Sequence, residues 1–285
     1  MKPLFLLAPL GAILLAGCAQ NATQRDFSSA PRDVAASYIS ARAFDSAQVA
    51  LRDNDTAKLR RAANDLRLAA ARGNNARLSA AFVQLVAQSA VTKDLSASSL
   101  PLEARNASRQ RAEEKYRIAL SALPRDYQLI WELQLDANTL NTLGYFLAEH
   151  GKNVEEFRLA EFLTSASLAK WDELLKEIGV DDPRLVSAHY LRAVTAGDSR
   201  AWALFRLKRY PEAERAMREV LQVTTDYGPQ LGEPLSPELP FHMAEILRAQ
   251  GKTEEAEIYY QKALELNPDA ELRAKIQSLL EGKIG

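Results

Sequence analysis

The chain has 285 residues, of which 26% are charged and 47% hydrophobic, and its formal net charge at pH 7 is −1. A chain of this length and composition forms one large folded domain or two modest ones. The near-neutral charge gives no basic excess to neutralise phosphates, so the composition disfavours nucleic-acid binding. The single cysteine excludes an intramolecular disulfide and a cysteine-based metal cluster.

Turn-forming residues are scarce, with 12 glycines and 12 prolines in the whole chain. Sandwiches and barrels need a turn about every 8–12 residues, so this scarcity favours helices. Alanine, leucine, arginine, glutamate and glutamine are abundant, and all are strong helix formers. The composition therefore predicts an all-α protein.

Residues 1–17 predict a secretory signal peptide. Lys2 gives a positive start, residues 4–15 are almost wholly apolar, and small residues precede Cys18. This order is typical of secretory signals. The apolar run is shorter than the roughly 20 residues that cross a bilayer, so we do not expect a permanent membrane helix.

The residues Leu15-Ala16-Gly17-Cys18 resemble the lipobox of bacterial lipoproteins. The resemblance implies that the Cys18 thiol receives a diacylglyceryl group and that the signal is cut before it. Acyl chains contribute about 0.8 kcal/mol per buried methylene, which makes a lasting anchor. Ala19, in place of aspartate, implies the outer membrane facing the periplasm. The alternative is a plain signal peptide followed by an incidental cysteine.

A tether and a first group of helices follow the anchor. Residues 18–32 are polar and show no apolar period, which predicts a flexible spacer. Residues 33–95 predict an N-terminal helical region of three helices, beginning with Asp33 as the first N-cap.

Turn signals divide this helical region. Residues 53–56 interrupt the first helix and cap the second, and Gly73 ends the second helix. Short turns between helices make them antiparallel neighbours. The serine-rich residues 92–101 predict a surface loop before the rest of the chain.

Residues 105–285 contain a recurring pattern of small and large side chains. The order alanine, aromatic, alanine, proline occurs at Ala256, Tyr260, Ala263 and Pro268, and again at Ala112, Tyr116, Ala119 and Pro124. A partial copy contains Ala213, Met217 and Val220. A companion first-helix pattern occurs at Leu140, Leu143, Gly144, Leu147 and Gly151, and at Met243, Ala244, Leu247 and Gly251. Internal repetition of this kind predicts a repeat architecture.

These segments resemble the tetratricopeptide repeat, an antiparallel helix pair of about 34 residues. In that family small residues let the two helices approach closely, an aromatic fills the gap towards the next unit, and a proline ends the second helix. One unit cannot bury its apolar face alone, so neighbouring units stack. The resemblance implies an all-α superhelix, a solenoid of antiparallel helix pairs, over residues 105–285.

Departures from the family pattern predict that this superhelix is irregular. Residues 126–136 and 224–237 have the character of insertions between repeats. Residues 154–180 lack the expected small side chain, because Glu156 and Phe157 stand where alanine belongs.

The resemblance also implies a partner-binding surface, since first-helix residues line the concave face in this family. The residues that fall at those positions are Asn138, Asn141, Tyr145, Glu149, Asp198, Trp202, Phe205, Arg206, Phe241, Glu245 and Arg248. Asparagines can hold the backbone of an extended peptide, and aromatic residues anchor side chains. The alternative is that Trp202 and Tyr145 simply pack against neighbouring helices.

Signals for catalysis or for a cofactor are weak. His242 and Glu245 share a helical face but lack a second histidine at metal-binding spacing, and the sequence contains no H-E-x-x-H. Asp182 precedes Pro183, an arrangement common at helix starts. Motifs of serine hydrolases and phosphate-binding glycine loops are absent. We therefore expect no enzyme activity, no metal and no cofactor.

Together these features predict a membrane-anchored envelope lipoprotein that acts as a scaffold or adaptor for other envelope proteins or peptides. The alternative is a peptide- or solute-binding lipoprotein that feeds a transporter. Such receptors usually alternate strands with helices in two lobes, which the helical composition disfavours.

Overall fold

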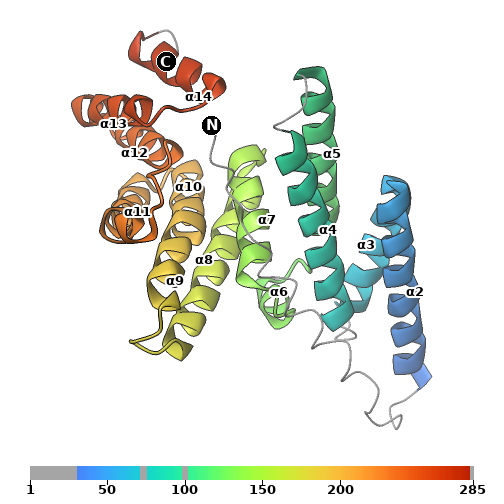
Figure 1. The fold of residues 1–285 in the computed structure, drawn as a ribbon. Helices are drawn as coiled ribbons and strands as arrows, with labels where there is room; N and C mark the ends of the chain where they lie inside the picture. The colour runs from blue at the N-terminus through green and yellow to red at the C-terminus, as the bar shows by residue number, and fades with distance from the viewer. Residues whose placement is uncertain (1–30, 71–75, 98–101, 283–285) are drawn as a thin grey trace.

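A computed structural model describes residues 31–70, 76–97 and 102–282, and within these ranges every regular element is helical. The helices stack in chain order as antiparallel pairs, so the fold is an all-α solenoid (Figure 1). The predicted signal peptide, Cys18 and the tether as far as residue 30 lie outside the described residues. None of the described helices has both the length and the apolar character needed to cross a membrane.

The first pair consists of α2 (Pro31–Asp53) and α3 (Thr56–Ala70). The break between them lies where the sequence predicted it: Asn54 adopts a left-handed conformation with φ of 56°. The Asp55 carboxylate then accepts a hydrogen bond of 3.0 Å from the backbone N–H of Lys58, which caps α3. The two helices meet through small alanines, which allow a close approach.

The second pair consists of α4 (Ala76–Ala97) and α5 (Leu102–Ser121). The prediction of a loop over residues 92–101 is wrong for 92–97, which continue α4. Across this pair the buried Lys115 Nζ donates to Ser89 Oγ at 2.7 Å. The expected division between residues 33–95 and 105–285 thus separates two helices of one pair.

The third pair consists of α7 (Ala137–His150) and α8 (Val154–Glu177), preceded by the short α6 (Tyr127–Glu132) inside the predicted insertion. A Cβ atom added to Gly144 would lie 2.6 Å from Thr164 Cγ2 and 3.2 Å from the Ala160 carbonyl oxygen. α7 and α8 therefore touch at this glycine. The expected small residue of α8 exists, but it is Ala160, about one helical turn after Glu156.

The fourth pair is longer than a standard repeat. Its first arm runs through α9 (Arg184–Arg192), a π-helical turn η2 (Ala193–Gly197) and α10 (Asp198–Arg206), and its second arm is α11 (Tyr210–Leu231). The predicted insertion over residues 224–237 is therefore mostly helix, and α11 ends where Gly232 adopts φ of 68°. The start of α9 is as expected, because Asp182 accepts from the Arg184 backbone N–H at 2.8 Å.

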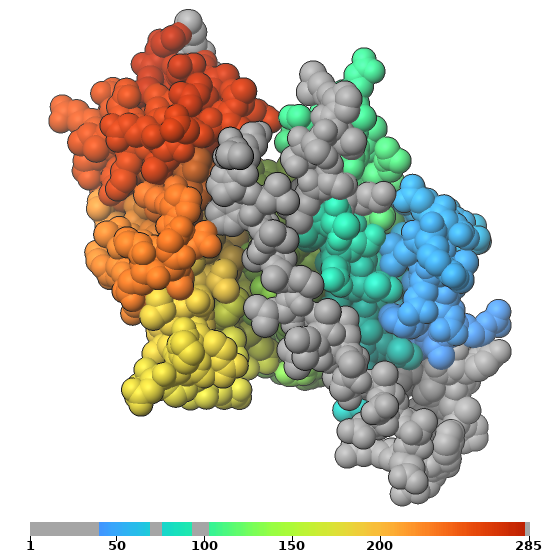
Figure 2. All heavy atoms as spheres, viewed as in Figure 1, coloured from blue at the N-terminus to red at the C-terminus, as the bar shows by residue number. Residues whose placement is uncertain are grey.

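The last pair consists of α12 (Glu238–Ala249) and α13 (Thr253–Glu265), and α14 (Ala270–Leu280) covers its end. One hydrophobic cluster extends from α2 to α10 and another from α10 to α14, and Phe205 packs against both. The stack curves enough to bring Arg109 of α5 within 3.5 Å of Glu271 of α14. These helices occupy the same upper side of the molecule in Figure 2.

Candidate partner-binding groove

A surface groove of about 210 Å³ lies between α7 and the preceding pair. α7 contributes most of the lining, and α4 and α5 complete it; the lining residues are Val91, Tyr116, Asn141, Thr142, Tyr145, Phe146 and His150. The residues of α7 in this list recur at spacings of three and four, so they project from one side of the helix. The groove therefore follows from how α7 is oriented against the second pair.

Aromatic rings form much of the groove wall. The rings of Tyr116 and Phe146 have centroids 4.7 Å apart, and the His150 ring lies 5.1 Å from Phe146. Tyr116 and Phe146 are buried, whereas Tyr145 is 38% exposed. The groove thus combines a rigid aromatic base with one tyrosine that a ligand can reach.

Asn141 contributes an amide group to the lining of this groove. Its Oδ1 atom is buried and has no hydrogen-bond partner among the described residues. An amide carries both a donor and an acceptor, the same complement as a backbone peptide group. A buried acceptor without a partner costs about 1–3 kcal/mol, which a ligand could recover by hydrogen bonding after rotation of the side chain.

Arg117 closes the groove at the C-terminal end of α7, beside His150. Its guanidinium donates to Glu156 Oε1 at 2.9 Å and to the His150 carbonyl oxygen at 2.8 Å. It also lies 5.1 Å from the centroid of the Phe146 ring. These contacts join α5 to the turn between α7 and α8, so the two walls of the groove are held together.

A larger cavity of about 370 Å³ lies elsewhere, beside Tyr127 and Leu159. Tyr127 stacks on Phe162 with centroids 4.5 Å apart. Among the described residues that line this cavity, none has a buried polar atom without a partner. Its size alone therefore does not make it the better candidate.

Two of the four predicted contact residues on α7 line the groove. Asn141 and Tyr145 line the groove, Asn138 is exposed near the start of α7, and Glu149 is half-buried near its end. Their role in binding stays a prediction. Sequence reasoning missed the contribution of Val91, Tyr116, Thr142, Phe146 and His150.

The predicted contact residues on α10 do not line an open surface. Trp202 is only 5% exposed, stacked between Phe205 at 4.6 Å and His242 at 4.3 Å. Asp198 is buried and lies 2.8 Å from His242 Nδ1. The expected exposure of Asp198 and Trp202 is thus wrong, because these side chains fill the contact between α10 and α12.

Arg206 and Phe205 also act within the fold. Arg206 Nη1 donates to the carbonyl oxygens of Ala148 at 2.7 Å and Glu149 at 3.0 Å, and its guanidinium lies 4.4 Å from the Phe157 ring centroid. A cation suits the unpaired carbonyls at a helix C-terminus. Arg206 therefore joins α10 to the end of α7, and Phe205 is half-buried beside it.

On α12 only Arg248 is exposed as predicted. Phe241 is 4% exposed, with Lys275 Nζ of α14 4.6 Å from its ring centroid. Glu245 is also buried, and it accepts a hydrogen bond from the Tyr260 hydroxyl. The expected exposure of Phe241 and Glu245 is therefore wrong, because α13 and α14 cover them.

Two segments of the chain match sequence models of the tetratricopeptide repeat, residues 195–225 and residues 241–270. The chain contains tetratricopeptide repeats. The first repeat comprises most of η2, α10 and the greater part of α11, and the second comprises most of α12 and all of α13. No curated protein matches the chain.

The small residues that carried the resemblance occupy the interior of these two repeats. Ala213, Met217 and Val220 of the first repeat are buried, and so are Ala256, Tyr260 and Ala263 of the second. The predicted repeat pattern is confirmed in both segments.

Glu214 connects the first repeat to the second. Its carboxylate accepts from Arg218 at 2.6 Å, from Gln250 at 2.8 Å and from Lys252 at 2.7 Å. Burial alone would raise the pKa of Glu214, but these donors outweigh it and lower the pKa to about 2. The helix–helix turn of the second repeat is thus attached to α11.

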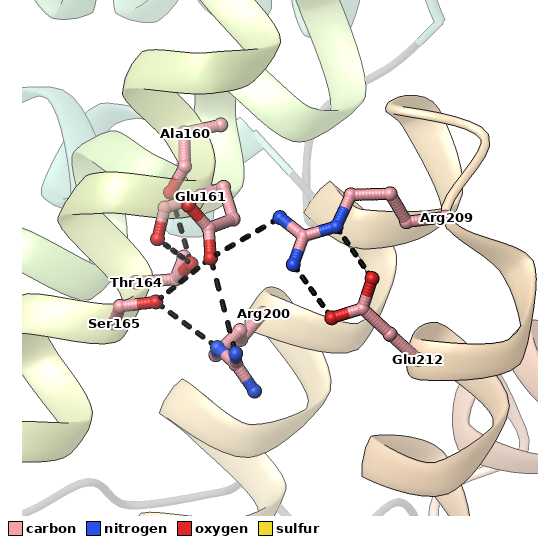
Figure 3. A network of polar contacts seen from close by, with 7 residues as sticks. All are labelled: Ala160, Glu161, Thr164, Ser165, Arg200, Arg209 and Glu212. Carbon is pink, nitrogen blue, oxygen red and sulfur yellow. Dashed lines mark hydrogen bonds and ion pairs between the residues drawn. The ribbon is translucent and has the colours of Figure 1, made fainter.

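A network of charged residues connects the first repeat to α8 (Figure 3). Glu161 Oε1 lies 3.8 Å from both Arg200 Nη2 and Arg209 Nη1, and it accepts from Ser165 Oγ at 3.3 Å. Arg209 also pairs with Glu212 through two hydrogen bonds of 2.7 and 2.6 Å. The opposite charges are paired within this network, so it serves to position α10 and α11 against α8.

His242 and Glu245, the pair considered from the sequence as a metal site, each contact other side chains. His242 faces Asp198, and Glu245 faces Tyr260 and Arg248. Burial, together with the contact to Glu245, raises the pKa of Tyr260 above its ordinary value. Among the described residues no cluster of three or more histidine, cysteine or acidic side chains is arranged to hold a metal ion.

Proposed function

We propose that this protein is an envelope lipoprotein whose helical repeats bind an extended segment of another protein in the groove of α4, α5 and α7. Tetratricopeptide repeats support a role as a protein-interaction scaffold. The observation that carries the choice of site is the buried Asn141 Oδ1 atom, which has no hydrogen-bond partner among the described residues and belongs to a groove lined by aromatic rings. We propose no catalytic activity for it.

An extended peptide fits this groove chemically. Its backbone offers an N–H and a C=O to the Asn141 amide at the same time, which a helix or a folded surface cannot do because its peptide groups are already paired. The ring of Tyr145, 38% exposed, can pack on a side chain of the same segment. Such contacts with aromatic anchors are common in interfaces with high affinity.

The lipid anchor is part of the proposal and rests on the sequence around Cys18. Acylation there would hold the solenoid at a membrane surface, and we propose the periplasmic face of the outer membrane. The second function considered from the sequence, a solute receptor with alternating strands and helices, has no support from the helical elements of the described ranges.

The anchor is tested by Cys18→Ser in the full-length chain. We expect the variant to move from the membrane fraction to the soluble envelope fraction, because no acyl chains remain to hold it. Fractionation followed by immunoblotting measures this. Unchanged recovery in membranes would contradict the anchor.

The groove is tested with a double variant, Asn141→Ala with Tyr145→Ala, in the full-length chain purified in mild detergent. Co-purifying proteins are quantified by mass spectrometry, and we expect at least about a tenfold loss, as for removal of interface anchor residues.

Tyr127→Ala with Gln128→Ala is a matched control, because it also removes one tyrosine and one amide. Tyr127 is 39% exposed, close to the value for Tyr145. We expect partner recovery to stay unchanged in this control. Equal losses in the two double variants, with circular dichroism showing that both are folded, would contradict the proposed groove.

A further inference from the structure

A buried histidine connects the two tetratricopeptide repeats. His242 lies on α12, its side chain is 5% exposed, and its Nδ1 atom is 2.8 Å from Asp198 Oδ1 on α10. The Asp198 side chain is 11% exposed. The imidazole also stacks on the Trp202 ring, with centroids 4.3 Å apart and the planes inclined by 20°. An ionisable pair thus lies in the buried contact between α10 and α12.

The charges that face His242 are predominantly negative. Asp198 acts from α10, Glu149 from α7 and Glu238 from α12 itself. Glu245, one turn further along α12, is paired with Arg248 and Tyr260.

The basic side chains near this contact are directed elsewhere. Arg206 of α10 is bonded to the carbonyl oxygens of α7, and Arg200 is bonded to Ser165. Lys252, after α12, is paired with Glu214 of α11. The surroundings therefore favour a positive charge on the imidazole.

We propose that the Asp198–His242 pair is a pH-sensitive contact that holds the two repeats together in acid and loosens their junction as the medium becomes alkaline. When His242 is protonated, its charge compensates the buried Asp198 carboxylate. When it is neutral, the carboxylate keeps one hydrogen bond but loses its counter-charge, and an uncompensated buried charge is strongly unfavourable.

The direction of the pH dependence follows from the charges. Burial by itself lowers the pKa of His242, but the Asp198 carboxylate and the hydrogen bond to it outweigh burial and raise the pKa above 6.5. A raised pKa in the folded state means that the added stability is complete below about 6.5 and is lost as pH rises through the folded-state pKa. The junction is accordingly strongest in acid.

A titration of the full-length chain in detergent tests this proposal without altering the pair. His150→Gln with His189→Gln leaves His242 as the remaining histidine of a chain that has 3. We expect its ring C–H signals in NMR to titrate with a single midpoint above pH 6.5. We also expect the melting temperature to fall over the same pH range. A midpoint at or below 6.5, or no titration between pH 4 and 10, would overturn the proposal.

Asp198→Asn is the matched variant, because it keeps the shape and a hydrogen-bonding group while removing the charge. We expect the His242 midpoint to fall below that of the wild type and the alkaline decrease in melting temperature to disappear. An Asp198→Asn profile that parallels the wild type from pH 5 to 9 would show that the pair does not control the junction, and would refute the inference.

Discussion

Replacing Gly144 with valine should force α7 and α8 apart. Even the first added atom, the Cβ, would lie 2.6 Å from Thr164 Cγ2, 3.1 Å from the Thr164 backbone nitrogen and 3.2 Å from the Ala160 carbonyl oxygen. Rotation of the Thr164 side chain could relieve the first of these contacts, but the other two atoms belong to the backbone of α8 and can give way only if the helix shifts. The helices must therefore separate.

The expected loss of stability is about 2–3 kcal/mol. Overpacking of a tight contact costs about 1–3 kcal/mol, and the two methyl groups of valine place the substitution at the upper end of this range. Valine has a better helix propensity than glycine, which returns only about 0.4 kcal/mol. The net loss is a sizeable fraction of the roughly 5–15 kcal/mol by which domains are stable.

Urea unfolding followed by circular dichroism measures this difference in unfolding free energy. Gly179→Ala is the control, because a Cβ there meets nothing within 4 Å and its φ is not positive. We expect the control to stay within about 0.5 kcal/mol of the wild type. If Gly144→Val were as stable as the control, the close approach of α7 and α8 would be disproved.

Two further substitutions test how the units are joined. Arg206→Ala should lower the unfolding free energy by about 2 kcal/mol, because the α7 carbonyls lose their charged donor. Arg206→Lys should recover about half of this loss, since an ammonium lacks the planar fork of the guanidinium. Equal stabilities of the two variants in urea would contradict this prediction. Glu214→Gln should lower it by about 2 kcal/mol at pH 7. The full difference between a pKa of about 2 and the ordinary 4.5 corresponds to roughly 3 kcal/mol, which we reduce because Arg218 and Lys252 are partly exposed. Because the pKa of Glu214 is lowered in the folded state, its stabilising effect is complete above about pH 4.5 and is lost as the pH falls towards 2. The melting temperatures of the wild type and Glu214→Gln should therefore converge in acid. A difference that stays constant with pH would contradict the assignment.

The sequence predicted the helix pairs well because their signals are local. The break at residues 53–56 needs only a left-handed Asn54 and the Asp55 cap, both of which are readable from the chain. The small residues of the two repeats are buried as their spacing indicated. In α8 the small residue was expected at position 156, but it lies at position 160. The reason is that the point of closest approach between α7 and α8 depends on how the two helices are offset along their axes.

The surface available to a partner was less predictable, because it depends on contacts between distant residues. Asp198 and Trp202 occupy family positions that face a concave surface, yet His242, 44 residues after Asp198, covers them. The groove beside Asn141 also needs walls from α4 and α5. No motif in α7 indicates how these two helices pair with each other. Position within one helix could therefore locate Asn141 and Tyr145 but not their neighbours.

Site-specific photo-crosslinking in intact cells tests the central claim most directly. A photoreactive amino acid replaces Tyr145 in the groove or, as control, Ile258, which is 67% exposed on α13. The groove account predicts a crosslinked protein partner at position 145, joined through residues of an unfolded or extended segment, and a much weaker product at position 258. Equal crosslinking at both positions, or products at 258 alone, would contradict it.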